Sequence, residues 1–194
     1  MYLSRILSPV QSLGPGNRIV ILTAGCTKHC PECANPELWG THNRKNYTPE
    51  QISQILHRIA EHQPVDGLTF TGGDPLEQHQ ELLYLLSLIQ DISGDILVYT
   101  GYTLEELKQE ILSEAAFQEF TALLSVLIDG RYIASLNCPE AVLKGSLNQN
   151  IYYFRPEYQP AYEAYLHQGR KIQNFFLDSA LISVGIHNRK ESFT

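Results

Sequence analysis

The chain has 194 residues and a mass of 22.0 kDa, which is enough for one domain with a buried core. Its net charge of −7 argues against a surface that binds nucleic-acid phosphates, and no apolar run reaches the roughly 18–20 residues that span a bilayer. Four cysteines, three of them clustered, do not form a disulfide framework, and residues 1–16 lack the apolar segment of a signal peptide, so we expect a cytoplasmic protein with reduced thiols.

The expected elements alternate between strands and helices along the chain. An apolar, β-branched run at residues 17–25 predicts a buried strand that ends in a turn at Gly25. Thr48 as N-cap and Pro49 at the first helical position predict the start of a helix whose apolar residues recur at helical spacing. Further strands are expected at 66–73, 95–102 and 123–130, and further helices at 76–92 and 104–120.

This alternation predicts an α/β fold, with a parallel sheet and helices packed outside it. Later segments, 148–154 and 179–187, have the composition of additional strands. In parallel α/β folds the functional groups gather at the carboxyl ends of the strands. The loops that follow the first four expected strands therefore meet at one rim, and a cluster of cysteines lies on the first of these loops.

The cysteine cluster consists of Cys26, Cys30 and Cys33. Three thiolates can hold three irons of a [4Fe–4S] cluster and leave the fourth iron open to a cofactor or substrate. Two alternatives remain open from the residues alone. One is a zinc ion bound by the three cysteines and His29 or His42, and the other is three reduced cysteines without a ligand.

The spacing Cys-x3-Cys-x2-Cys resembles the signature of radical S-adenosylmethionine (SAM) enzymes. The chain is most similar to the small activating enzymes of anaerobic ribonucleoside-triphosphate reductases, with which it shares six stretches in the same order over about residues 10–154. These stretches are GPGNR, GCTKHCPECANPELW, TGGDPLE, YTGYTLEEL, VLIDGRY and KGSLNQ. The resemblance implies a partial, laterally open (β/α)6 barrel within a single domain of residues 1–194, in which 155–194 form a C-terminal extension.

The resemblance also implies the chemistry. The three cysteines would bind the cluster, SAM would chelate the open iron, and an electron from a donor such as flavodoxin would release a 5′-deoxyadenosyl radical that takes a hydrogen atom from a polypeptide. Gly72, Gly73 and Asp74 match the glycine-glycine-acid element that binds the SAM ammonium group. The alternative for these residues is a plain strand-to-helix turn in which Asp74 caps a helix at Pro75.

Four more residues are candidates on the same basis. Thr100 is a candidate contact of the SAM ammonium or ribose, and Asp129 and Arg131 end the fourth strand, where Arg131 is a candidate for the SAM carboxylate. Asn35 is a candidate brace of the cysteine loop. For Thr100 and Arg131 the alternatives are an ordinary turn and a surface arginine.

The chain departs from the family pattern in three places. Glu32 precedes the third cysteine where the family usually has glycine, Ala34 follows that cysteine where an aromatic residue or histidine is common, and the extension of 155–194 has no counterpart in compact members. We expect residues 179–187 to complete the barrel as a buried strand, with Leu181, Ile182, Val184 and Ile186 in the core.

Three functions remain open at this point. The chain either activates a glycyl-radical reductase by removing hydrogen from a backbone glycine, or modifies a ribosomally made precursor peptide together with a small recognition protein, as the spliceases do. The third alternative is a zinc or iron–sulfur binding module without turnover. No nucleic acid and no membrane are expected as partners.

Overall fold

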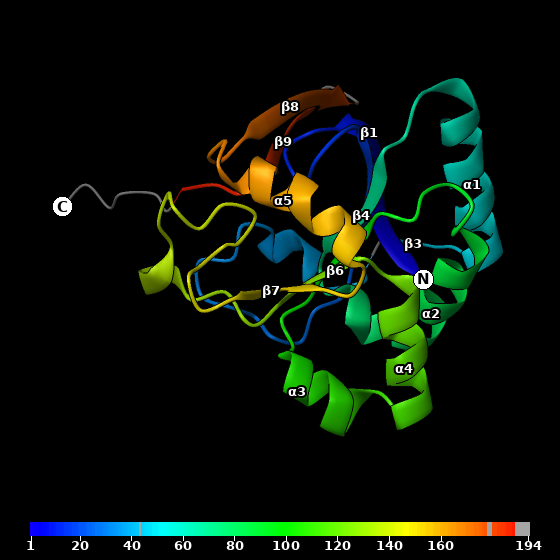
Figure 1. The fold of residues 1–194 in the computed structure, drawn as a ribbon, viewed down its shortest axis with the longest axis horizontal. Helices are drawn as coiled ribbons and strands as arrows, with labels where there is room; N and C mark the ends of the chain where they lie inside the picture. Colours follow the sequence, from blue (N-terminus) through cyan, green and yellow to red (C-terminus); the bar gives the residue numbers. More distant parts are fainter. Residues whose placement is uncertain (43, 178–179, 189–194) are drawn as a thin grey trace.

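The computed structural model describes residues 1–42, 44–177 and 180–188 and shows a mixed α/β fold built on a seven-stranded sheet (Figure 1). Across the sheet the strands are β3 (Lys45–Asn46), β1 (Tyr2–Val10), β2 (Arg18–Thr23), β4 (Gly67–Gly72), β5 (Ile96–Tyr99), β6 (Val126–Asp129) and β7 (Asn150–Tyr153). The helices are α1 (Pro49–His62), α2 (His79–Leu88), α3 (Leu104–Glu106), α4 (Glu114–Leu123) and α5 (Gln159–Leu166). A separate hairpin contains β8 (Ile172–Leu177) and β9 (Ala180–Gly185).

The four central strands β2, β4, β5 and β6 run parallel to one another, as the sequence predicts. Every residue of β2 is buried, because the sheet is covered on both faces. Ile19 and Ile21 face the core that α1, α2 and α4 cover, whereas Val20 and Leu22 face the opposite side. The alternating apolar residues of one strand thus hold two layers of the molecule together.

Helix α1 begins where its capping residues predict. The Thr48 side chain accepts a hydrogen bond from the Gln51 amide at 3.3 Å, and the Gln51 side chain accepts one from the Thr48 amide at 3.0 Å. Ile52 and Leu56 are the fully buried apolar residues of this helix and pack into the main core. Within the residues that the structure describes, every helix is too short or too polar to span a bilayer.

One expectation about local structure is wrong, and one strand of the sheet was not expected from the sequence. The helix expected over 104–120 is divided, because Ser113 interrupts it and caps α4 by accepting a hydrogen bond from the Ala116 amide at 3.2 Å. The strand that the sequence does not predict is β1. Irregularities between Leu3 and Arg5 and between Leu7 and Val10 in its pairing with β2 break the alternation that marks a strand.

The two strands that flank the four central strands, β1 and β7, run antiparallel to them. β1 pairs antiparallel with β2, and β7, which confirms the strand expected at 148–154, pairs antiparallel with β6. The fold is therefore α/β with a mixed sheet, and a barrel of six strand–helix repeats remains a prediction.

The C-terminal extension covers the face of the sheet opposite to α1, α2 and α4. Figure 1 shows α5 and the β8–β9 hairpin on the side of the sheet away from α1 and α2. Tyr162 and Tyr165 of α5 pack against β5 and β6, and Val184 of β9 packs against β1 and β2. The extension thus closes the second layer of the core.

The expectation of a fully buried strand at 179–187 is wrong in one respect. β9 begins at Ala180 and pairs with β8 outside the main sheet, and Ser179 lies outside the described residues. Val184 is buried, but Leu181 is 59% exposed, and its cross-strand neighbour Phe176 is 81% exposed. The hairpin buries one face, because it lies on the sheet instead of extending it.

Candidate functional site

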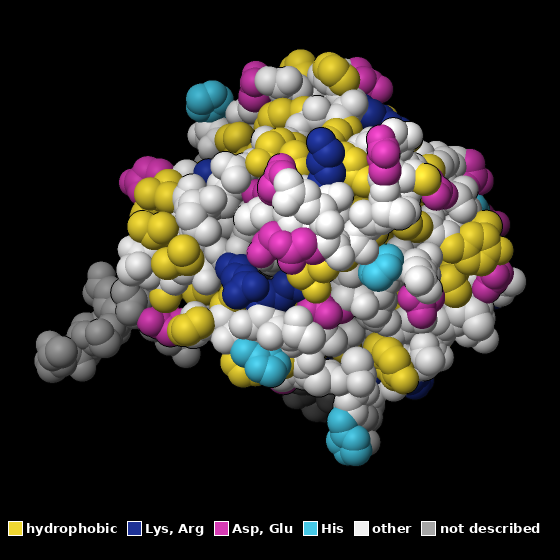
Figure 2. Space-filling view, turned by 90° about the horizontal axis from the view of Figure 1, so that it is seen from below, with side chains coloured by type: hydrophobic (Ala, Val, Ile, Leu, Met, Phe, Trp, Pro, Cys, Tyr) yellow, Lys and Arg dark blue, Asp and Glu magenta, His cyan; other side chains and the backbone are white. Residues whose placement is uncertain are grey.

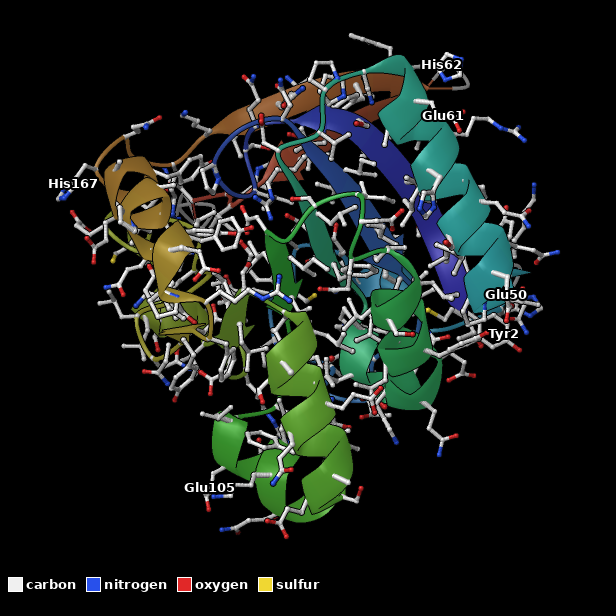
Figure 3. The ribbon with its side chains drawn as sticks, turned by 45° about the vertical axis from the view of Figure 1, so that its right-hand side comes forward. Tyr2, Glu50, Glu61, His62, Glu105 and His167 are labelled. Atoms are coloured by element: carbon white, nitrogen blue, oxygen red, sulfur yellow. The ribbon has the colours of Figure 1, made fainter. Side chains whose placement is uncertain are left out.

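The loops after β2, β4 and β5 meet at the carboxyl ends of these parallel strands. Helix α3, which follows β5, marks the lower side of the molecule in Figure 1, and Figure 2 shows that side as a surface. Near the middle of this face, Lys and Arg side chains lie next to Asp and Glu side chains. The rim is therefore rich in charges of both signs, although the chain as a whole is acidic.

The first loop carries the three cysteines and folds back on itself. The Gly25 amide donates to the Leu38 carbonyl and the Cys26 amide donates to the Trp39 carbonyl, both at 2.9 Å. These two bonds close the loop at its base, so its two ends leave the sheet side by side. Cys26, Cys30 and Cys33 are all half-buried on it.

Two residues of this loop have the left-handed backbone that glycine adopts most easily. They are His29, with φ of 46°, and Glu32, with φ of 57°. A glycine would adopt the backbone conformation of Glu32 without strain, which fits the glycine that the resemblance leads us to expect before the third cysteine. This chain keeps the turn and accepts a backbone conformation that is unfavourable for a glutamate.

The three thiol sulfurs of this loop are chemically suited to bind a [4Fe–4S] cluster. Burial raises the pKa of the Cys26 thiol, although backbone N–H groups of Lys28 and His29 act in the opposite direction. The Asn35 amide donates to Cys33 Sγ at 3.4 Å, and hydrogen bonds of this kind to the sulfurs tune thiolate clusters.

A single metal ion would require a tighter arrangement of ligands. Among residues 1–42, 44–177 and 180–188, no group of three or more His, Cys, Asp or Glu side chains is arranged to hold one metal ion. A [4Fe–4S] cluster binds each thiolate at a different iron, so three cysteines that serve it do not converge on one point.

The glycine pair after β4 allows the second loop to approach the first. A Cβ atom on Gly72 would lie 2.5 Å from the Thr23 carbonyl oxygen, and one on Gly73 would lie 2.4 Å from that of Gly25. The space is used by hydrogen bonds from the Gly73 amide to Thr23 at 2.9 Å and from the Asp74 amide to Gly25 at 2.8 Å. The glycines are thus required by backbone packing beside the cysteine loop.

Asp74 is buried at the centre of the rim. Its carboxylate accepts hydrogen bonds from the Leu76 amide at 3.0 Å, from Thr100 Oγ1 at 2.9 Å and from the Gly101 amide at 2.9 Å. The structure therefore brings together two predicted site residues, Asp74 and Thr100. It also shows the capping role for Asp74, which precedes the turn at Pro75–Gln78.

Lys28 is the residue of this rim that sequence reasoning missed. Its side chain is 2% exposed, and Nζ lies 3.0 Å from Asp74 Oδ2 and 2.7 Å from Glu77 Oε1. It also lies 3.0 Å from the centroid of the Tyr102 ring. Burial lowers the pKa of Lys28, but the charge of Asp74 and the bonds to Glu77 outweigh this effect, so the pKa is raised and the ammonium stays charged.

The fourth strand ends beside Tyr102, because the Gly130 amide donates to the Tyr102 carbonyl at 2.9 Å. Asp129 is buried and accepts hydrogen bonds from the Leu104 amide at 2.7 Å and from the Asn150 amide at 3.1 Å, so it joins α3 to β7. Arg131 is exposed. The structure thus places these two predicted residues at the rim without bringing them to Asp74.

Comparison with known proteins gives two findings. The sequence model of a family described as "4Fe-4S single cluster domain" matches residues 12–152. Several curated proteins are similar over most of their own length, and each is called anaerobic ribonucleoside-triphosphate reductase-activating protein.

The protein from Escherichia coli (strain K12) is 32% identical over 148 residues, which are 73% of this chain and 92% of that protein. The protein from Salmonella typhi is 33% identical over 150 residues, with 73% of this chain and 92% of that protein covered. The protein from Enterobacteria phage T4 is 32% identical over 144 residues, with 72% and 85% covered.

Proposed function

The chain belongs to the family of 4Fe-4S single cluster domains, and we propose that it is a radical SAM enzyme that activates an anaerobic ribonucleoside-triphosphate reductase. The observation that carries the proposal is the closed loop with three half-buried thiols at the ends of parallel strands. The names of the relatives support a protein as the substrate. We propose the cytoplasm as its location and a donor such as flavodoxin as its source of electrons.

The residues of the rim have separate roles in this proposal. Cys26, Cys30 and Cys33 would hold a [4Fe–4S] cluster, and the backbone amide of Asn35 would stabilise the Cys33 thiolate. When the cluster and SAM are bound, they supply a 5′-deoxyadenosyl radical for hydrogen abstraction. Gly72 and Gly73 would hold the loop after β4 against the cysteine loop, because their missing side chains allow the close backbone contacts to Thr23 and Gly25, and their contact with the SAM ammonium group stays a prediction.

Three charged or polar residues complete the proposed cofactor site. Thr100 would orient Asp74, to which it donates a hydrogen bond at 2.9 Å. Arg131, which is exposed at the rim, would be available to a carboxylate of the cofactor. Asp129 would keep the end of the fourth strand in place through its bonds to Leu104 and Asn150.

The proposed barrel is supported by β2, β4, β5 and β6, which are parallel and lie side by side in the order in which they follow one another along the chain. They would form four strands of a partial, laterally open barrel. An open side admits a polypeptide, as the abstraction of hydrogen from a backbone glycine requires.

The proposal is tested by measuring cluster formation and SAM cleavage in cysteine variants. Purified protein is reconstituted with iron and sulfide without oxygen, and the formation of 5′-deoxyadenosine is measured with SAM and dithionite. Alanine at position 26, 30 or 33 is expected to abolish both the brown cluster and 5′-deoxyadenosine, because each thiolate holds one iron. Cys138→Ala is the matched control and should retain both. Reductive SAM cleavage by Cys30→Ala would refute the proposal.

The substrate is tested separately. The reconstituted protein is incubated with SAM, dithionite and an anaerobic ribonucleoside-triphosphate reductase, and electron paramagnetic resonance is recorded for a glycyl radical. A glycyl signal that depends on the three cysteines supports activation. SAM cleavage without this signal, together with a mass change in a precursor peptide, would instead support the maturation of peptides.

A further inference from the structure

The rim contains a buried cluster of one ammonium group and two carboxylates, those of Lys28, Asp74 and Glu77. The two carboxylates differ in how many of their oxygens accept hydrogen bonds from the chain. Asp74 Oδ1 accepts from the Leu76 amide and from Thr100, and Asp74 Oδ2 accepts from the Gly101 amide and from Lys28. Both oxygens of Asp74 are therefore satisfied by the chain itself.

Glu77 has one carboxylate oxygen that can still accept hydrogen bonds from a ligand. Its Oε1 accepts from the Thr27 amide at 3.1 Å, from Thr27 Oγ1 at 2.6 Å and from Lys28 Nζ at 2.7 Å. Within the described parts of the chain, no hydrogen-bond donor is found for Oε2 of this residue. The Glu77 side chain is also 18% exposed, compared with 2% for that of Asp74.

The charges of the cluster do not balance. One ammonium and two carboxylates leave one negative charge, and the carboxylate with a spare oxygen borders the cysteine loop through Thr27, the neighbour of Cys26. A ligand with an ammonium group would balance this charge. If the ammonium group of such a ligand paired with Asp74 instead, it would displace Lys28 from that carboxylate. Lys28 would then lose a partner while its side chain remained buried, which is unfavourable.

We infer that Glu77, and not Asp74, is the carboxylate that binds the ammonium group of SAM, and that Asp74 is a structural residue that holds Lys28 and the loop after β5. This inference rests on the proposed function, because it names a cofactor contact at the same site. It departs from the assignment that the glycine-glycine-acid element suggests.

The test compares ligands that differ in the ammonium group. Binding of SAM, S-adenosylhomocysteine and 5′-methylthioadenosine to the cluster-loaded protein is measured without reductant, so that no turnover is needed. S-adenosylhomocysteine keeps the ammonium group but lacks the sulfonium charge, and 5′-methylthioadenosine lacks both. Iron content and melting temperature are recorded for Glu77→Gln and for the matched variant Asp74→Asn.

Glu77→Gln is expected to weaken SAM and S-adenosylhomocysteine by roughly 10- to 100-fold, the range for a lost hydrogen bond to a charged group, and to change 5′-methylthioadenosine less than about 2-fold. Asp74→Asn is expected to lower the melting temperature and to change all three affinities by a similar factor. Glu77→Asp, which keeps the charge, should retain the preference for the two ligands that carry an ammonium group.

Three results would overturn the inference. They are an equal loss for all three ligands in Glu77→Gln, a Glu77→Gln protein that cannot hold the cluster, and a loss selective for the ammonium ligands in Asp74→Asn with normal binding by Glu77→Gln. If the wild-type protein does not bind SAM, the proposed function falls and this inference falls with it. If the wild type binds SAM and Glu77→Gln is unchanged, this inference alone is wrong.

Discussion

The two ends of the parallel strands each bury an ion cluster, and the two clusters are completed differently. At the amino ends, Arg18 donates to Asp95 Oδ2 at 2.6 Å, to Thr69 Oγ1 at 2.6 Å and to the Leu68 carbonyl at 2.7 Å. Asp95 also accepts from the Tyr162 hydroxyl at 2.8 Å. This cluster has one cation and one anion, whereas the cluster of Lys28, Asp74 and Glu77 at the carboxyl ends has one cation and two anions.

The difference fits a structural role for the amino ends and, in the proposed function, a ligand-binding role for the carboxyl ends. A buried ionic network stabilises a fold when every member has its partners, and an incomplete network leaves a group that something else must satisfy. The amino-end network is closed by Tyr162, a residue of the C-terminal extension. The network at the carboxyl ends leaves one oxygen and one negative charge beside the cysteines.

The largest expected effect on stability is at the amino ends of the parallel strands, where Arg18 and Asp95 pair. Arg18→Leu should lower the free energy of unfolding by about 3–5 kcal/mol, because the carboxylate of Asp95 would remain buried without its cation. Denaturant unfolding of the apo-protein measures this value. Arg131→Leu is the control, since this exposed arginine should change stability by less than about 0.5 kcal/mol. Similar losses in the two variants would show that the amino-end network has no special role.

A smaller effect isolates the contribution of the extension. Tyr162→Phe keeps the buried ring but removes the hydroxyl that donates to Asp95 at 2.8 Å. We expect a loss of about 1–2 kcal/mol, measured by the same denaturant unfolding, because a buried carboxylate loses one donor. Tyr84→Phe, at an exposed tyrosine, should be near neutral. If Tyr162→Phe is also neutral, Asp95 does not depend on the extension.

The smallest effect tests an ion pair outside both networks. The pKa of His57 is raised, chiefly by the Ser53 carbonyl that lies 2.8 Å from Nδ1 and also by Asp91. A raised pKa in the folded state means that the stabilisation is complete below the unfolded value, about 6.5, and disappears as the pH rises through the folded value. Because Asp91 is largely exposed, the effect should be under about 1 kcal/mol.

The measurement is the difference in unfolding free energy between wild type and His57→Ala at pH 5.5 and at pH 8.5. The wild type should have its advantage at the lower pH. A difference that grows towards pH 8.5 would contradict the assignment.

The sequence predicts those parts of the fold that depend on local pattern. The four parallel strands follow from apolar, β-branched runs that end at glycine or polar residues, and α1 begins at Thr48 because its capping residues fix that boundary. β1 was missed because its bulges disturb the alternation, and the division at Ser113 was missed because the flanking residues favour helix. These features depend on tertiary pairing more than on local preference.

The candidate site shows the same limit. The cysteines and the glycine pair could be recognised because their spacing is itself the signal. The ion pairs of Lys28 could not, since they form between loops that are 46 and 49 residues apart by number and meet only when β2 and β4 pair. The available signal was an acid at Asp74 and another one helical turn later at Glu77, opposite a lysine within the cysteine loop.

The extension also determines when the core can be completed during synthesis on the ribosome. The hydroxyl of Tyr165 donates to the carbonyl of Gln11, which lies 154 positions earlier in the sequence. At the roughly 5–20 residues per second of protein synthesis, these two partners are made on the order of ten seconds apart. All strands of the main sheet are made before α5, so the sheet carries one apolar face uncovered until α5 emerges and covers it.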